Sequence, residues 1–119
     1  MRTLVIKCTA GAEEPERCNQ AFTVATAAIA SGAKVTLWLT GEAAWFGVPG
    51  RAEAFELALA GSLAEARDLV IEAGELIVCS QCAARRDLTE EDLMPGARIA
   101  GAAAFAESVL GEGVQALVY

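Results

Sequence analysis

The chain has 119 residues, of which 55% are hydrophobic, and a formal net charge of −7 without a single histidine. This length supports one domain over residues 1–119, whose core needs neither a disulfide nor a metal because about two-thirds of the unfolded surface becomes buried. The acidic balance argues against a nucleic-acid partner, which requires clustered cations. The lack of histidine excludes Cys-His and Ser-His nucleophile pairs and imidazole metal ligands.

The chain also lacks the marks of a membrane or exported protein. No apolar run approaches the ~18 residues of a membrane span. The start, Met1 to Ile6, lacks the long apolar region of a signal peptide. We therefore expect no membrane partner and a cytoplasmic location. In a reducing compartment, cysteines more often indicate redox, sulfur or metal chemistry than disulfides. The four cysteines are Cys8, Cys18, Cys79 and Cys82.

The first predicted unit is a strand, a loop and a helix. The strand runs from Thr3 to Cys8, and the helix begins near Pro15, whose missing N–H is not needed in the first turn. One face of the helix is apolar at spacings of three and four. Its members are Cys18, Ala21, Phe22, Ala25, Ala28 and Ile29. We expect Cys18 to pack in the core, near the loop that Cys8 enters.

The second predicted unit begins after Gly32, which suits the residue that follows a helix. A strand from Val35 to Leu39 follows and closes at the Gly41-Glu42 turn. A strand, helix and strand with a crossover of this length form a parallel pair. Residues 43–50 read as a loop with a helical turn. Its aromatics, Trp45 and Phe46, pack on the sheet edge in the simplest reading and line a pocket or an oligomer contact in the alternatives.

The remaining elements follow in order. Residues 51–59, with Phe55 and Leu59 four apart, are predicted to form a short helix. Ser62 and Glu65 form a capping box that starts a helix from Leu63 to Ala73. The predicted sheet-facing residues of that helix are Leu63, Ala66, Leu69, Val70 and Ala73. The later predictions are a strand at 75–78, a capped turn at 89–92, a turn at Pro95-Gly96 that leads into residues 97–100, a helix at 101–110 and a strand at 114–118.

The Cys79-Ser80-Gln81-Cys82 motif follows the apolar strand at 75–78 and stands where a short helix should begin. Unpaired backbone N–H groups and the positive end of the helix dipole favour a thiolate at that point. Cys79 is therefore the predicted reactive sulfur. Cys82, one helical turn further, suits a functional role and core packing about equally.

Alternating strands and helices predict a three-layer α/β/α fold of the Rossmann and flavodoxin-like type, with a mostly parallel sheet of about five strands. Function is expected at the carboxyl ends of the strands. Cys8, the Gly41-Glu42 turn and Cys79 each end a strand, so they should meet at one edge. The residues that we expect in an auxiliary pocket are Cys8, Glu13, Cys18, Gly41 and Glu42.

Charged residues near this edge have simpler roles than catalysis. Loop solvation and capping explain Glu13 and Glu42 better than proton transfer does. Arg85 and Arg86 stand about 10 Å along the helix from Cys79 at 1.5 Å per residue. We expect them to complement the negative end of that helix, or to bind Asp87 or Asp92.

Several segments together resemble the DsrE/DsrF-like family, and the resemblance covers nearly the whole chain. They are Cys8-Thr9-Ala10-Gly11 with Pro15-Glu16-Arg17, Val35-Thr36-Leu37-Trp38-Leu39-Thr40-Gly41-Glu42, and the stretch from Val78 to Ala103. This chain has Ser80-Gln81 where related proteins often carry Gly-Pro, and Asp87 where they often carry Gly. Asp tolerates the left-handed turn that such a Gly adopts.

The resemblance implies a parallel α/β fold, a homotrimer or homohexamer, and a sulfur-accepting role for Cys79. On this reading the protein is a sulfur carrier or sulfurtransferase-like protein that holds a persulfide or mixed disulfide on Cys79, with Cys82 as resolving thiol and with donor and acceptor proteins as partners. No cofactor and no metal is expected. Two alternatives stay open: the four cysteines bind zinc or an iron–sulfur cluster, or the protein is an oligomeric regulatory module with inert thiols.

Overall fold

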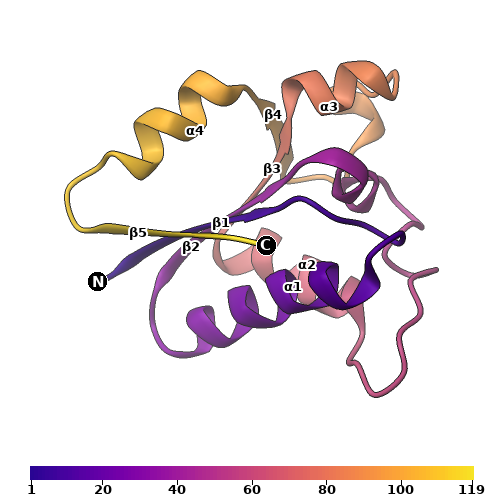
Figure 1. Ribbon diagram of the computed structural model, residues 1–119, viewed down its shortest axis with the longest axis horizontal. Helices are drawn as coiled ribbons and strands as arrows, with labels where there is room; N and C mark the ends of the chain where they lie inside the picture. The colour runs from indigo at the N-terminus through magenta and orange to yellow at the C-terminus, as the bar shows by residue number, and fades with distance from the viewer.

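The computed structural model describes residues 1–119 as a five-stranded sheet with helices on both sides (Figure 1). The strand order is β4-β3-β2-β1-β5, and every neighbouring pair is parallel. The elements are β1 (Thr3–Cys8), α1 (Pro15–Ala30), β2 (Lys34–Leu39), the 3-10 helix η1 (Gly41–Gly47), α2 (Leu63–Ala73), β3 (Glu75–Cys79), α3 (Ser80–Arg85), the 3-10 helix η2 (Glu90–Asp92), β4 (Ala97–Ala100), α4 (Ala102–Val109) and β5 (Val114–Val118). The predicted α/β class is confirmed. No helix of this set is both long enough and apolar enough to cross a membrane.

The two faces of the sheet are covered unequally. Helices α1 and α2 lie below the sheet in Figure 1, and α3 and α4 lie above it. The main core holds 20 buried residues, including those that α1 and α2 bury. The second core holds only Val5, Trp38 and Ile77, against which Phe105 and Val109 of α4 pack. Because α4 itself has no buried residue, this side of the molecule carries the thinner layer.

Helix α1 follows the sequence signals closely. Pro15 stands in its first turn with Glu16 beside it, and Gly32 follows its end with φ +92°. A positive φ favours glycine, which has no Cβ to clash with the backbone. The predicted apolar face is confirmed, since four of its members are fully buried and the other two pack against the core. The buried four are Cys18, Ala21, Phe22 and Ala25.

Helix α2 begins as predicted but turns a different face to the core. The Glu65 N–H donates to Ser62 Oγ at 3.1 Å, which confirms the cap. The prediction that Leu69 and Ala73 face the sheet is wrong, because both are exposed. Leu63, Arg67 and Val70 are buried instead. At about 100° per residue these three share one stripe, and Leu69 lies outside it. Arginine is rarely buried without a partner, and here Glu53 and Asp68 supply carboxylates.

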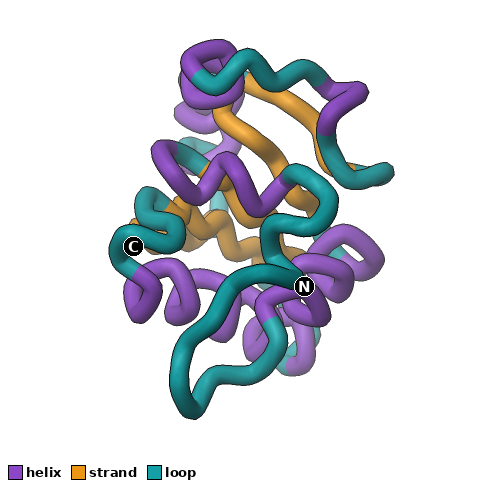
Figure 2. The backbone as a smooth tube through the Cα atoms, turned by 90° about the vertical axis from the view of Figure 1, so that its right-hand side faces the viewer, coloured by secondary structure: helices purple, strands orange, loops and turns teal.

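The predicted helix at 51–59 is also wrong. The segment forms turns within the long loop between η1 and α2, which projects from the body in Figure 2. Phe55 packs edge-on against Phe46, with ring centroids 5.6 Å apart. Leu59 is fully exposed and has φ +65°, so the two residues do not share a helical face. A bidentate ion pair ties the loop back, since Arg67 donates to both Glu53 oxygens at 2.9 and 2.8 Å.

This ion pair predicts an acid-dependent loss of stability. The hydrogen bonds from Arg67 lower the pKa of Glu53 to about 2. A depressed carboxyl pKa adds stability above the unfolded value of about 4.3, and that stability is lost as pH falls towards the folded value. We expect Glu53→Gln to lower stability at pH 7 and to flatten its decline between those two values. Urea unfolding over this pH range tests it, with exposed Glu56→Gln as the control; unchanged pH curves in Glu53→Gln would contradict it.

Candidate functional site

Cys79 is the last residue of β3 and the N-cap of α3. The three residues before it, Leu76 to Val78, are buried and hold the strand in the middle of the sheet. Cys79 itself is half-buried, with extended dihedral angles of φ −61° and ψ 131°, and the chain enters α3 directly after it. The predicted place of this thiol, at a strand end and a helix start, is confirmed.

The surroundings of Cys79 favour the thiolate. Burial raises the pKa of its thiol, but the backbone N–H of Cys82, the Cys82 side chain, the backbone N–H of Gln81 and the charge of Lys7 together bring the pKa below the ordinary value. The thiolate is the nucleophilic form of cysteine. Cys79 is therefore the thiol that this structure best equips for attack on another sulfur.

Cys82 lies beneath the surface and connects α3 to the loop after β2. It is 8% exposed, and its Sγ accepts a hydrogen bond from the Gly41 N–H at 3.1 Å. Gly41 has φ +56°, and a Cβ there would lie 2.9 Å from the Thr9 carbonyl oxygen. The loops that follow β1 and β2 thus meet the helix that follows β3. The predicted convergence at one sheet edge is confirmed, with β2 standing between the other two strands.

Glu42 and Arg86 form a salt bridge over the end of α3. Arg86 Nη2 and Nε donate to Glu42 Oε2 at 2.7 and 3.1 Å, and Arg86 Nη1 donates to the Cys82 carbonyl at 3.0 Å. Arg86 therefore complements the helix end as predicted. The alternative, binding of Arg86 to Asp87 or Asp92, is not found, since its carboxylate partner is Glu42. The hydrogen bonds from Arg86 lower the pKa of Glu42, so this carboxylate stays ionised and paired.

The two aspartates have other roles. Asp92 accepts hydrogen bonds from the backbone and side chain of Thr89 and so caps η2, as predicted for that turn. Asp87 adopts φ +55°, which confirms the left-handed turn expected at this position. Neither carboxylate therefore competes for Arg86.

Cys8 and Cys18 form a separate pair in the core. Both are fully buried, and Cys8 Sγ donates to the Ala10 carbonyl at 3.2 Å. The hydrogen bond with Cys8, and after it burial, raises the pKa of Cys18. The same hydrogen bond lowers the pKa of Cys8. Both thiols lie away from solvent, so the packing role predicted for Cys18 is confirmed. Glu13 caps its own loop by accepting from the Gly11 N–H at 2.6 Å. No three Cys, Asp or Glu side chains gather in one chain as metal ligands would.

Sequence reasoning missed Lys7. It precedes Cys8, the last residue of β1, and is half-buried, with its Nζ 4.0 Å from the centroid of the Phe105 ring. The available signal was a lysine inside an apolar strand that the topology buries at the centre of the sheet. Charged residues are unusual in such strands, which read as nearly continuous apolar runs.

Trp45, Phe46 and Val48 do not form an exposed apolar segment. Phe46 is only 4% exposed, and the other two are half-buried. Trp45 and Phe46 instead line a hollow of about 220 Å³ together with Glu42 and Arg51. The exposed large apolar residues near the C-terminus are Leu110, Leu117 and Val118.

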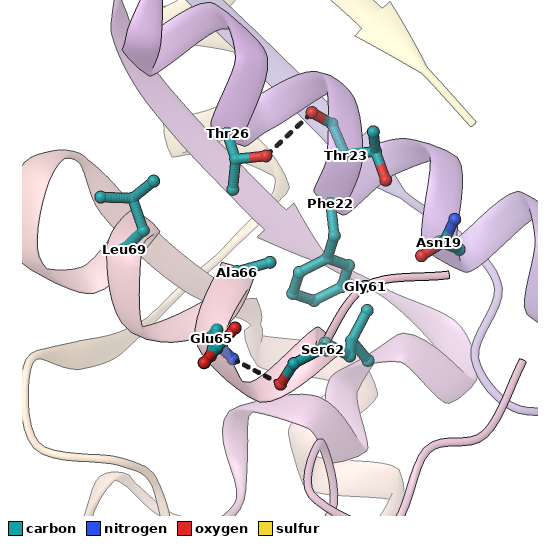
Figure 3. Close-up of a pocket in the computed structure, with 10 residues that line it drawn as sticks. Asn19, Phe22, Thr23, Thr26, Gly61, Ser62, Glu65, Ala66 and Leu69 are labelled. Atoms are coloured by element: carbon teal, nitrogen blue, oxygen red, sulfur yellow. Dashed lines mark hydrogen bonds between the residues drawn. The ribbon is translucent and has the colours of Figure 1, made fainter. Parts of the chain in front are cut away.

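A larger groove of about 360 Å³ lies between α1 and α2 (Figure 3). Phe22 reaches from α1 toward Ser62 and Ala66, and two local hydrogen bonds, Thr26 to Thr23 and Glu65 to Ser62, satisfy polar groups along it. None of its lining residues is a cysteine. The groove is therefore separate from the thiol site.

Comparisons with known proteins agree with this fold. The model of the DsrE/DsrF-like family matches residues 2–117. The crystal structure of the YchN protein from E. coli superposes with a TM-score of 0.83 at 17% sequence identity, over 100% of this chain and 100% of that chain. No curated protein sequence matches the chain. At this identity the structural likeness supports the fold alone.

Proposed function

Because this chain belongs to the DsrE/DsrF-like family, we propose that it acts in a sulfur relay, with Cys79 as the sulfur-carrying thiol. The observation that carries the proposal is the position of Cys79: a half-buried thiol at the junction of β3 and α3, with its pKa lowered by hydrogen bonds from the first turn of the helix. Such a thiolate is suited to attack one sulfur of an S–S bond and displace the other.

Loading is a displacement at sulfur. The Cys79 thiolate attacks the terminal sulfane sulfur of a donor persulfide, R–S–SH. A new bond forms between that sulfur and Cys79 while the donor S–S bond breaks, and the donor leaves as its thiolate. Cys79 then carries –S–SH. An acceptor thiolate attacks the outer sulfur in the same way and restores the Cys79 thiolate, so no net oxidant or reductant is needed.

Cys82 gives a second outcome from the same intermediate. If the Cys82 thiolate attacks the inner sulfur of the loaded Cys79, a Cys79–Cys82 disulfide forms and the outer sulfur leaves as hydrosulfide, HS⁻. An external dithiol must then reduce the disulfide before the next cycle. Carrier behaviour and redox behaviour therefore differ in whether sulfur passes to a thiol or is released as sulfide.

The experiment that tests the proposal is loading with glutathione persulfide, followed by intact-mass measurement and peptide mapping. We expect one added sulfur on the peptide that contains Cys79. Protein that takes up no sulfur, or that takes it up on Cys8 or Cys18, would contradict the proposal.

We further propose that the protein is a symmetric homo-oligomer, most simply a trimer or hexamer. Three exposed apolar residues support it: Leu110 at the end of α4, and Leu117 and Val118 in the edge strand β5. Apolar surface of this kind commonly marks contacts between chains. We expect light scattering at micromolar concentration to give a multiple of the 12.3 kDa chain mass. The mass of a single chain would contradict it.

A further inference from the structure

Lys7 is a charged side chain near the carboxyl edge that the proposed chemistry has not used and that no salt bridge includes. We propose that its ammonium group is a positioning charge for Cys79, which stabilises the anionic forms of that sulfur: the thiolate before loading and the persulfide anion after it. The persulfide part of this inference rests on the proposed function. The thiolate part stands on the structure of the resting protein.

The sheet register brings Lys7 and Cys79 to one face. Lys7 pairs with Trp38 of β2, and Trp38 pairs with Ile77 of β3, two residues before Cys79. Side chains two apart along a strand point to the same face. That face is the one covered by α4, because Trp38 and Ile77 form the second core. Cys79, at the end of the strand, also packs against the main core. The Lys7 backbone thus lies two strands from that of Cys79.

Aromatic residues hold the ammonium group in place. Lys7 Nζ stands 4.0 Å from the centroid of the Phe105 ring. Phe105 in turn meets Trp38 edge-on, with centroids 5.3 Å apart and planes at 87°. A cation above an aromatic face is attracted by the electron-rich ring. This arrangement keeps the charge beneath α4 instead of letting the side chain extend into solvent.

The Lys7 charge has no carboxylate to neutralise it. The salt bridges of the chain use Arg67, Arg86 and Arg98, and none includes Lys7. The side-chain carboxylates at the same edge have other partners: Glu42 is paired with Arg86, and Glu13 accepts from the Gly11 N–H. A half-buried cation without an ion partner stabilises an anion that forms nearby. The deprotonated Cys79 sulfur is such an anion. Lys7 is among the groups that lower the Cys79 pKa, together with Cys82 and the N–H groups of α3.

The test is the pH dependence of Cys79 alkylation by iodoacetamide, measured by peptide mapping. We expect Lys7→Met to raise the midpoint by about half a pKa unit and to slow alkylation at pH 7 about threefold. Methionine keeps an unbranched apolar chain against Phe105. Lys7→Arg, which restores a cation, is expected to return the midpoint close to that of the wild type.

The matched control is Lys34→Met. Lys34 is the chain's other lysine, and it is exposed at the opposite end of the neighbouring strand. Its removal changes the net charge equally and should leave the midpoint unchanged. Phe105→Leu, which retains the Lys7 charge and removes the ring, should give a smaller shift in the same direction. A wild-type midpoint in Lys7→Met, or in Phe105→Leu if Lys7→Met fails to fold, would overturn the inference, as would an equal shift in Lys34→Met.

Alkylation requires no sulfur donor, so this experiment separates the two proposals. A shifted midpoint in a protein that never accepts sulfur supports the role of Lys7 and contradicts the sulfur relay. Sulfur loading together with an unshifted midpoint supports the sulfur relay and contradicts the role of Lys7. If both hold, the persulfide on Lys7→Met protein should lose its sulfur to an acceptor thiol at a rate different from that of Lys34→Met protein.

Discussion

Cys79→Ser is expected to abolish sulfur loading while the protein remains folded. A serine hydroxyl is a far weaker nucleophile than a thiolate and forms no stable persulfide. Serine is also a preferred N-cap residue, so α3 should still begin at the same place. The Cys79 side chain is half-buried and not part of the fully buried core, which limits the effect on stability. Intact-mass measurement after exposure to glutathione persulfide gives the extent of loading, and circular dichroism reports the fold.

Cys18→Ala is the matched control for this variant. It also removes one thiol, but from a residue that is fully buried in α1 and far from solvent. We expect it to load as much sulfur as the wild type. Equal loading in Cys79→Ser would move the site to another cysteine and would refute the assignment of Cys79.

Local sequence signals predicted most of the fold because they act over a few residues. Pro15 starts α1, Ser62 caps α2, and Thr89 with Asp92 caps η2. Apolar runs between these signals gave the strands, and the helical crossovers between the strands indicated parallel pairing. The strand order could not be read in this way, since it depends on where each crossover carries the chain.

The errors lie where a long-range contact overrides a local pattern. The spacing of Phe55 and Leu59 favoured a helix, but Phe55 is held by Phe46, and the loop around it by Arg67. Arg67 was not among the residues predicted to face the sheet, and its burial depends on a carboxylate 14 positions away. No periodicity in a single sequence reveals such an ion pair.

The same distinction applies to the candidate site. The place of Cys79 follows from one apolar strand and the helix after it, so it was predictable. The hydrogen bond from the Gly41 N–H to Cys82 Sγ joins residues 41 positions apart. The salt bridge between Arg86 and Glu42 joins residues 44 positions apart. Both require the spatial neighbourhood of β2 and β3. Lys7 depends on three strands and α4 together, which explains why the sequence alone did not connect it with Cys79.

Cys82→Ala is expected to leave loading of Cys79 intact and to abolish the release of hydrosulfide. The two cysteines are three positions apart at the start of α3, a spacing that places their side chains on nearly the same face. The Cys82 side chain is among the groups that lower the pKa of Cys79. Cys82 is therefore placed to attack a loaded Cys79, although it is only 8% exposed to outside reagents. Without it, sulfur on Cys79 should persist until an acceptor thiol arrives.

The measurements are sulfide release from loaded protein and mass spectrometry after mild oxidation, with free thiols alkylated before digestion. Wild-type protein should give a reversible Cys79–Cys82 disulfide, and Cys18→Ala should do the same. Because a stabilised thiolate favours the reduced state, this disulfide should be oxidising and easily reduced by a dithiol. If no linked peptide appears and Cys82 is alkylated only after denaturation, the role of Cys82 is to pack in the core, where its Sγ accepts a hydrogen bond from the Gly41 N–H. Cys79 then acts alone.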